Sequence, residues 1–317
     1  MTYILDFKMK SKLVTAYWMD VPGYPFQGAS SIRKKRYLGS LISHCIGSKL
    51  PVVCYTHKIS FDELNEIKEN YKLNNLEIKI LELTDIKFHN KINNIRSNKF
   101  DPNLDGRGTE IMWGKFDILE RELDGFDNVY WVDAGLQHPG IFPWMFSKVH
   151  NKNLANFGIP NNWWDVLDVF NFSKFINHKF YDKLNVICKN KIMFVCSYGP
   201  QIGYPLQPNN IVDYLFSSPY PVGGMFGGNV KILKKYLNLF WSYAEKVLDK
   251  EILCTEEVLM KPAYDLMPEE ELYTGIFDCF SSSIENHDEF HYEMWKPHKQ
   301  TRKPFYMVWQ EIKTKKL

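Results

Sequence analysis

The sequence of 317 residues lacks the cysteine patterns of zinc-binding and disulfide-rich proteins. Its 6 cysteines are scattered, without a C-x-x-C pair. Several of them lie in apolar stretches such as VVCYT and MFVCSY. We therefore expect buried free thiols, which favour a reducing compartment.

A long apolar run is also missing. No segment approaches the roughly 20 apolar residues that a helix needs to cross a bilayer. The first residues, MTYILDFKMKSK, contain no long apolar signal region. We therefore expect a cytoplasmic protein without a transmembrane segment.

An excess of charge of one sign is absent as well. The chain has 39 Lys and Arg residues against 37 Asp and Glu residues, a net charge of +2. Generic nucleic-acid binders usually show a strong basic bias, so this balance argues against that class. Two local basic segments remain, IRKKR at residues 32–36 and KPHKQTRK at residues 296–303. Each is either a solvated surface or a place where an anionic partner such as a diphosphate binds.

Two nucleotide-binding fingerprints are missing from the Gly-rich segment GGMFGG at residues 223–228. It has neither the G-x-G-x-x-G order of a dinucleotide fold nor the G-K-[ST] of a P-loop, which argues against NAD binding and ATP hydrolysis. The surrounding PYPVGGMFGGNV is expected to be a turn-rich apolar segment that leads into a helix. Its paired glycines would let the backbone approach a ligand closely.

What is present is an alternation of strand and helix patterns. The apolar runs LVTAYWMD, PVVCYTH, LEIKILEL, NVYWVD and KIMFVCSYG predict strands. Amphipathic stretches predict helices, among them one that starts at Ser60 and one that is closed by Gly125. Further helices are expected within residues 163–180, in KILKKYLNLFWSYAEKVLDKEIL and in TEEVLM. This order predicts an α/β fold with a mixed, mostly parallel sheet flanked by helices.

One acidic residue and one acidic pair stand out against this background. Asp133 ends the strand NVYWVD, and ligands of parallel sheets bind at the carboxyl ends of strands; such an Asp is equally a common turn former or helix cap. Glu256 and Glu257 are adjacent on a predicted helix and so point to different sides. One would face solvent and the other a cleft, although as surface charges they need no function, which is the more common case.

Taken together, the strand ending YWVDAG, the later GGMFGG and the EEVL helix resemble GT-A glycosyltransferases, and more narrowly the HtrL/YibB-type glycosyltransferase family. VTAYWMD, the R-x-x-x-Y pattern that begins at Arg33, and WGKFDIL fit as well. The resemblance covers about residues 13–260. It implies one GT-A-like (Rossmann-like) domain over residues 1–317, with a nucleotide-binding half at 1–135 and an acceptor-binding half at 136–317 that ends in a basic aromatic tail.

The resemblance implies that the chain moves a hexose or pentose from a nucleotide-sugar donor to a hydroxyl acceptor with help from a metal. In GT-A enzymes a D-x-D motif holds a divalent metal that bridges the donor diphosphate. Asp133 matches the first Asp, but Gly135 stands at the second position. Mn²⁺ or Mg²⁺ would then be held by Asp133 and a late histidine, His298 or His291, an imidazole favouring Mn²⁺. His138 is a further candidate ligand.

The remaining site residues are also assigned through the resemblance. Glu256 or Glu257 would be the general base for the acceptor hydroxyl. Negative charge on the leaving diphosphate needs cations, and the candidates, which equally suit a solvated helix face, are Arg33, Arg36 and Lys115. The cleft would be lined by Gly223, Gly224, Gly227 and Gly228. The base or ribose would contact Thr15, Ala16 and Tyr17, although Tyr17 and Trp18 equally suit a core.

Three acceptor or function classes stay open. The acceptor is expected to be a surface polysaccharide or lipopolysaccharide. An Asn-, Lys- and Ile-rich composition, typical of an AT-rich genome, raises a phage-type enzyme that glycosylates a hydroxylated base in DNA, with the two basic segments tracking phosphates. The missing second Asp raises a non-catalytic sugar-nucleotide-binding module.

Overall fold

The computed structural model describes residues 9–19, 21, 31–98, 108–135, 178–197 and 220–277. The strands of these residues form one seven-stranded sheet with the order β3-β2-β1-β4-β6-β5-β7. Strand β6 is antiparallel to both of its neighbours, and all other neighbouring pairs are parallel. The strands are β1 (Ser11–Tyr17), β2 (Val52–Thr56), β3 (Leu76–Ile80), β4 (Asn128–Val132), β5 (Ile192–Ser197), β6 (Tyr220–Asn229) and β7 (Leu272–Phe277).

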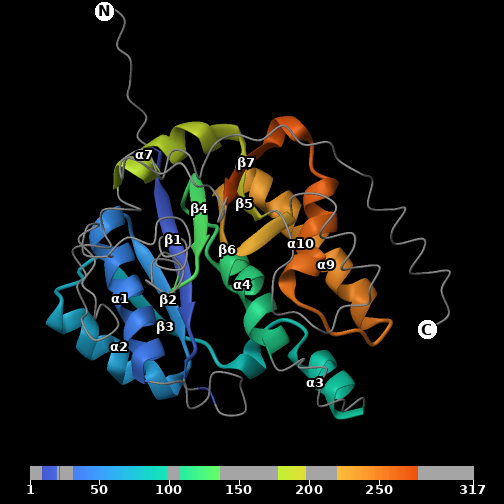
Figure 1. Ribbon diagram of the computed structural model, residues 1–317, viewed down its shortest axis with the longest axis horizontal. Helices are drawn as coiled ribbons and strands as arrows, with labels where there is room; N and C mark the ends of the chain where they lie inside the picture. The colour runs from blue at the N-terminus through green and yellow to red at the C-terminus, as the bar shows by residue number, and fades with distance from the viewer. Residues whose placement is uncertain are drawn as a thin grey trace, which may run out of the picture.

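Helices cover both faces of this sheet (Figure 1). One face packs against α1 (Ser31–Ser48), α2 (Lys58–Asn70) and α7 (His178–Ile187). The other packs against α3 (His89–Asn98), α4 (Thr109–Arg121), α9 (Val230–Leu248) and α10 (Glu256–Asp265). Short 3-10 turns are η1 (Leu83–Asp85), η4 (Cys188–Asn190) and η5 (Glu269–Glu271). The predicted α/β fold class, with a sheet that is mixed but mostly parallel and flanked by helices, is confirmed by this topology.

The period of two in the central strands explains why the sheet is covered on both sides. In β4, Val129 and Trp131 enter the core under α4 and α9, whereas Tyr130 and Val132 enter the core under α1 and α7. On the α4 side, Phe116 stacks between neighbouring rings at centroid distances of 5.0 Å and 3.6 Å, those of Phe226 and Phe240. Each such fully buried ring stabilises the fold by about 1.5–3 kcal/mol relative to an exposed one.

The turn-rich prediction for the double-glycine segment is wrong, because this segment is strand β6 in the interior of the sheet. Gly227 and Gly228 have φ angles of +134° and +141°, values that side-chain-bearing residues rarely adopt. A Cβ at Gly227 would overlap with the backbone oxygen of Val129 on β4. Glycine therefore lets β6 lie against its neighbour, and the segment resembles turns in composition only because close backbone packing in the sheet needs the same residue.

Two helix boundaries also differ from the prediction. Helix α2 begins at Lys58, not at Ser60, because the ring of His57 caps it by accepting a hydrogen bond from the Ile59 N–H at 3.3 Å. Helix α4 ends at Arg121, and Gly125 follows in a turn with φ +80°. In both cases the true cap is a residue that is less typical of helix ends.

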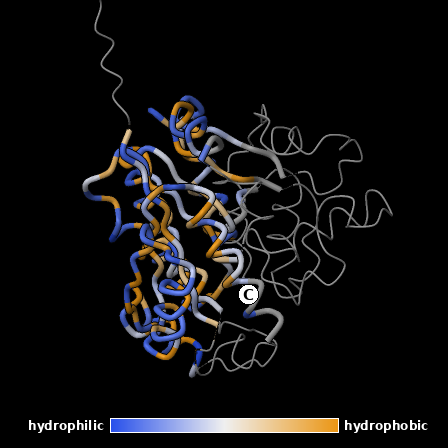
Figure 2. The backbone as a smooth tube through the Cα atoms, turned by 90° about the vertical axis from the view of Figure 1, so that its left-hand side faces the viewer, coloured by the Kyte–Doolittle hydropathy of each residue, from blue (hydrophilic) through white to orange (hydrophobic). Residues whose placement is uncertain are grey.

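The thiols and the apolar stretches agree with the sequence-based expectation as far as they are described. Four cysteines are free and buried, namely Cys45, Cys54, Cys188 and Cys254. None of the helices in the described ranges is long and apolar enough to cross a membrane. Hydrophobic residues follow the backbone in short stretches (Figure 2). The division into halves at residue 135, and the basic aromatic tail, stay predictions, since much of the second half lies outside the described residues.

Candidate functional site

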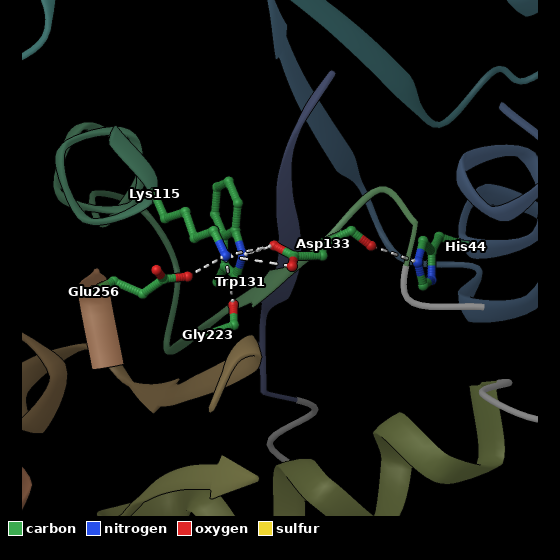
Figure 3. A network of polar contacts seen from close by, with 6 residues as sticks. All are labelled: His44, Lys115, Trp131, Asp133, Gly223 and Glu256. Atoms are coloured by element: carbon green, nitrogen blue, oxygen red, sulfur yellow. Dashed lines mark hydrogen bonds and ion pairs between the residues drawn. The ribbon is translucent and has the colours of Figure 1, made fainter. Parts of the chain in front are cut away.

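Asp133 directly follows β4, at the edge where the parallel strands β1 and β2 also end. Its N–H donates to the Gly224 carbonyl on β6 at 2.8 Å. Its own carbonyl lies 3.2 Å from Nε2 of His44 on α1, and since a carbonyl can only accept, Nε2–H is the donor. The carboxylate accepts from the Trp131 indole N–H at 2.8 Å (Figure 3). Three elements thus fix this residue, while 35% of its side chain stays exposed.

Lys115, on α4, holds this carboxylate together with two more oxygen groups (Figure 3). Its Nζ lies 3.2 Å from Asp133 Oδ1, 2.7 Å from Glu256 Oε1 and 3.2 Å from the Gly223 carbonyl. An ammonium has three N–H donors, so these acceptors satisfy it completely. The side chain is only 11% exposed. Lys115 therefore ties the end of β4 to β6 and to the start of α10.

Glu256 and Glu257 open helix α10, and both are buried, at 4% and 7% exposure. The expectation of surface charges, or of one carboxylate facing solvent, is therefore wrong. The sequence could not reveal this, because the burial comes from β6 and α4, which are distant in the chain. Within the described residues, Oε2 of each glutamate has no hydrogen-bond partner. A Cβ at Gly223 would overlap with Glu256 Oε1, so this glycine makes room for the ion pair with Lys115.

Burial and mutual contacts shift the pKa values of the charged groups in this cluster. Burial by itself lowers the pKa of Lys115, but the carboxylates of Asp133, Glu256 and Glu257 outweigh it and raise that pKa above its ordinary value. Burial raises the pKa of Asp133, and the Lys115 ammonium and the Trp131 N–H offset part of that rise. Burial and the neighbouring Glu256 raise the pKa of Glu257 to about 8. At neutral pH Lys115 is therefore an ammonium and Glu257 is a neutral acid.

No protein-family model matches this chain, and no curated protein matches it in sequence. Solved structures that resemble it include mouse xyloside xylosyltransferase 1 without ligands, with 8% identity over 92% of this chain and 95% of that chain and a TM-score of 0.42. They also include the galactosyltransferase LgtC in complex with donor and acceptor sugar analogues, with 9% identity over 91% and 84% of the two chains and a TM-score of 0.41.

A third similar structure is the 4-diphosphocytidyl-2C-methyl-D-erythritol synthase of Anaerococcus prevotii, with 12% identity over 90% of this chain and 94% of that chain and a TM-score of 0.38. Identities and TM-scores this low give these likenesses no weight for the function of this chain. The narrower HtrL/YibB-type resemblance stays a prediction.

The remaining predicted residues lie at varying distances from this cluster. Thr15 and Tyr17 lie in β1 and are each 1% exposed. Tyr17 belongs to the core under α1, which is the alternative that the sequence left open.

Gly224 lies beside Asp133, but Gly227 and Gly228 pair with Tyr130 and Val129, roughly 10 Å or more further along β6. The backbones of Arg33 and Arg36 belong to α1, and their side chains lie outside the described part of the structure.

The described residues at this strand end are poorly suited to bind a divalent metal. A Cβ at Gly135 would lie 2.7 Å from a ring carbon of Tyr37, so the second carboxylate of a D-x-D motif would require the end of this ring to move. Among the described residues, no three His, Cys, Asp or Glu side chains are arranged to hold a metal ion. His298, His291 and His138 lie outside the described residues, and the metal site of Asp133 and His298 therefore stays a prediction.

Three residues of the site were given no individual role at the sequence level. His44 and Tyr37 lie in a helix whose apolar spacing indicates packing, and Tyr37 entered only as part of the R-x-x-x-Y pattern. Trp131 stands two residues before Asp133 in a strand, so the two side chains share a face. That spacing was the one usable indication that the indole N–H meets the carboxylate.

Proposed function

We propose that this chain is a glycosyltransferase that moves a hexose or pentose from a nucleotide sugar to a hydroxyl acceptor. The observation that carries the proposal is the Asp133 carboxylate, which is held from several sides at the carboxyl end of β4 and yet keeps 35% of its side chain exposed. A residue that served only as a turn former or cap would not need support from side chains and backbone of several elements. The sequence resemblance to GT-A enzymes supplies the reaction class.

The reaction needs a group that removes a proton. In the transfer, the acceptor oxygen bonds to the anomeric carbon of the sugar, and the bond from that carbon to the diphosphate oxygen breaks. The nucleoside diphosphate leaves with the electron pair, and the hydroxyl proton passes to a base.

Of the two predicted bases, Glu256 fits better. Its Oε1 is bound by Lys115, and its Oε2 has no partner among the described residues, which leaves one oxygen to receive the proton. Glu257 has a pKa raised to about 8, so at neutral pH it already carries a proton and is less suited to accept one.

We further propose, from the resemblance, that the acceptor is a surface glycan or lipopolysaccharide. The DNA-acceptor alternative depends on the side chains of residues 32–36 and 296–303. Most of these lie outside the described residues, and no observation favours that alternative. The non-catalytic alternative is decided by activity.

The test begins with a thermal-shift screen of nucleoside diphosphates and nucleotide sugars. A specific ligand present at about 100 times its Kd stabilises the fold by about 2.7 kcal/mol. The nucleotide sugar that gives the largest shift is then used to measure hydrolysis and transfer. Activity in the wild type that is lost in Asp133→Ala supports a glycosyltransferase.

Two results would count against the proposal. If no nucleotide stabilises the protein, the proposal that it binds a nucleotide-sugar donor is refuted, and so is the proposed enzyme activity. Binding without turnover, equal in the wild type and in Asp133→Ala, would indicate a sugar-nucleotide-binding module.

A further inference from the structure

We infer that the ammonium of Lys115 is the resident cation of this site and stands where a GT-A-like enzyme would hold a divalent metal. The inference rests on the proposed function where it speaks of a donor. The contacts of Lys115 that support it do not depend on that function. It goes against the metal prediction drawn from the sequence. It makes donor binding by this chain independent of Mn²⁺ and Mg²⁺.

The first support is the coordination of Lys115. Oxygen atoms surround its Nζ as they would surround a small cation, with a carboxylate oxygen at 2.7 Å and a carbonyl oxygen at 3.2 Å, those of Glu256 and Gly223. The third group is the carboxylate of Asp133, with Oδ1 at 3.2 Å and Oδ2 at 3.3 Å. Carboxylate and carbonyl oxygens are the ligands that hard divalent cations prefer. Here the cage is already filled by a covalently attached cation.

The second support is the state of the position where the motif departs from D-x-D. Gly135 does more than omit a carboxylate. The ring of Tyr37 on the neighbouring helix α1 lies within 2.7–2.9 Å of the place where a Cβ would be, so this ring lies where the side chain of the missing ligand would begin. Loss of the ligand and packing of an aromatic ring into its place are two separate features, and both point the same way.

The third support is the electrostatic repulsion between Lys115 and a divalent ion. Asp133 and Glu256 are opposed by one ammonium, and both carboxylates touch it directly. A divalent ion on Asp133 would stand within a few ångströms of that ammonium, and their repulsion would oppose its binding. Conversely, removing the ammonium would leave two carboxylates and a carbonyl facing the vacated space. The structure therefore predicts that a divalent ion competes with Lys115 for the same oxygens.

The experiment compares Mn²⁺ binding by the EDTA-treated full chain and by Lys115→Ala, using the loss of the free Mn²⁺ EPR signal. We expect the wild type to bind no stoichiometric Mn²⁺ and Lys115→Ala to gain one site. The Mn²⁺ affinity of Lys115→Ala should be at least about tenfold higher than any residual Mn²⁺ affinity of the wild type. The gained site is expected to disappear in Lys115→Ala combined with Asp133→Asn. The matched control is Lys12→Ala, which removes another buried ammonium, one that pairs with Glu122 at 2.6 Å. It should gain no Mn²⁺ site.

A second measurement needs no variant at position 115. Calorimetric titration of the wild type with the stabilising nucleoside diphosphate, in EDTA and in Mn²⁺, should give Kd values within about threefold of each other. A stoichiometric Mn²⁺ site in the wild type that is lost in Asp133→Asn would overturn the inference, as would nucleotide binding that EDTA abolishes. Lys115→Ala that folds but gains no Mn²⁺ would overturn it too.

The two proposals fail in different ways. A chain that binds no nucleotide under either condition refutes the proposed function, while the Mn²⁺ titrations still decide the role of Lys115. A chain that binds and turns over a nucleotide sugar only with Mn²⁺ keeps the function and refutes the inference. If Lys115→Ala fails to fold, Mn²⁺ binding by the wild type and by Asp133→Asn decides whether the inference holds.

Discussion

Gly223 and Glu256 are fitted to each other: a Cβ at position 223 would overlap with the Glu256 oxygen that binds Lys115. The two residues lie on β6 and α10, which pack together beside the end of β4. The glycine therefore determines where the glutamate carboxylate sits, and through it where the ammonium sits.

Gly223→Ala should therefore damage the site more than the fold. The added methyl group displaces the Glu256 side chain from Lys115, and a misplacement of about 1 Å in a catalytic site costs about 100-fold in rate. Overpacking of this kind destabilises a fold by about 1–3 kcal/mol. Turnover of the nucleotide sugar and urea unfolding measure the two effects. Gly125→Ala is the control, because it strains a turn with φ +80° and nothing within 4 Å, so it should lower stability and leave turnover intact.

The pKa of Glu257 makes a prediction about stability and pH. Burial, then repulsion from Glu256, raise that pKa from 4.5 to about 8. Between these values the folded protein binds more protons than the unfolded chain, so stability falls as pH rises, by at most about 1.4 kcal/mol per pH unit. Above about pH 8 the loss is complete. Urea unfolding of the wild type and of Glu257→Gln between about pH 6.5 and 8, above the range in which His44 titrates, should show the slope only in the wild type.

The exposed Glu270→Gln is the control for this measurement and should keep the wild-type slope. Equal slopes in the wild type and in Glu257→Gln would show that the Glu257 carboxyl does not carry the coupled proton.

The sequence predicted the frame of this protein better than its interior. Apolar runs such as NVYWV, and amphipathic helices between them, are local patterns and were enough to predict the sheet. Asp133 could be placed at a strand end for the same reason. The buried state of Glu256 and Glu257 depends on contacts with β6 and α4, about 30 and more than 130 residues away in the chain, which no local pattern contains.

For the double-glycine segment, a local pattern was present but led to the wrong prediction. Its composition is that of a turn, and only the backbone of β4 against it, near Val129 and Tyr130, explains why glycine is needed inside a strand. Close approach of two backbones is a tertiary requirement, and it looks like turn chemistry when only one strand is visible.

Gly135→Asp restores the letters of a D-x-D motif and should not restore its chemistry. The new side chain would meet the ring of Tyr37, whose atoms lie 2.7–2.9 Å from the Cβ position. We expect a loss of stability of about 1–3 kcal/mol from overpacking and no gain of Mn²⁺ affinity, measured by urea unfolding and by EPR. The matched variant is Gly135→Asp with Tyr37→Ala, in which the space is opened. Tight Mn²⁺ binding by Gly135→Asp alone would show that the ring yields easily and is no barrier.

His44 should act as a positioning residue for Asp133. Burial lowers the pKa of this histidine to about 4, with the Asp133 carbonyl opposing part of that shift, so at neutral pH the ring is uncharged and Nε2–H donates to the carbonyl. A Gln amide places its N–H₂ group where Nε2 stands, whereas Leu of similar size has no donor. We expect His44→Gln to keep most of the turnover.

We expect His44→Leu to lose about tenfold in kcat and about 1–3 kcal/mol of stability, the cost of a buried carbonyl left without its donor. Since the folded pKa lies below 6.5, His44 should lower the stability of the wild type relative to both variants as pH falls from about 6.5 towards 4, on top of the opposite slope from Glu257. Equal losses of kcat in His44→Gln and His44→Leu would mean that ring packing, not the hydrogen bond to Asp133, is what matters at this position.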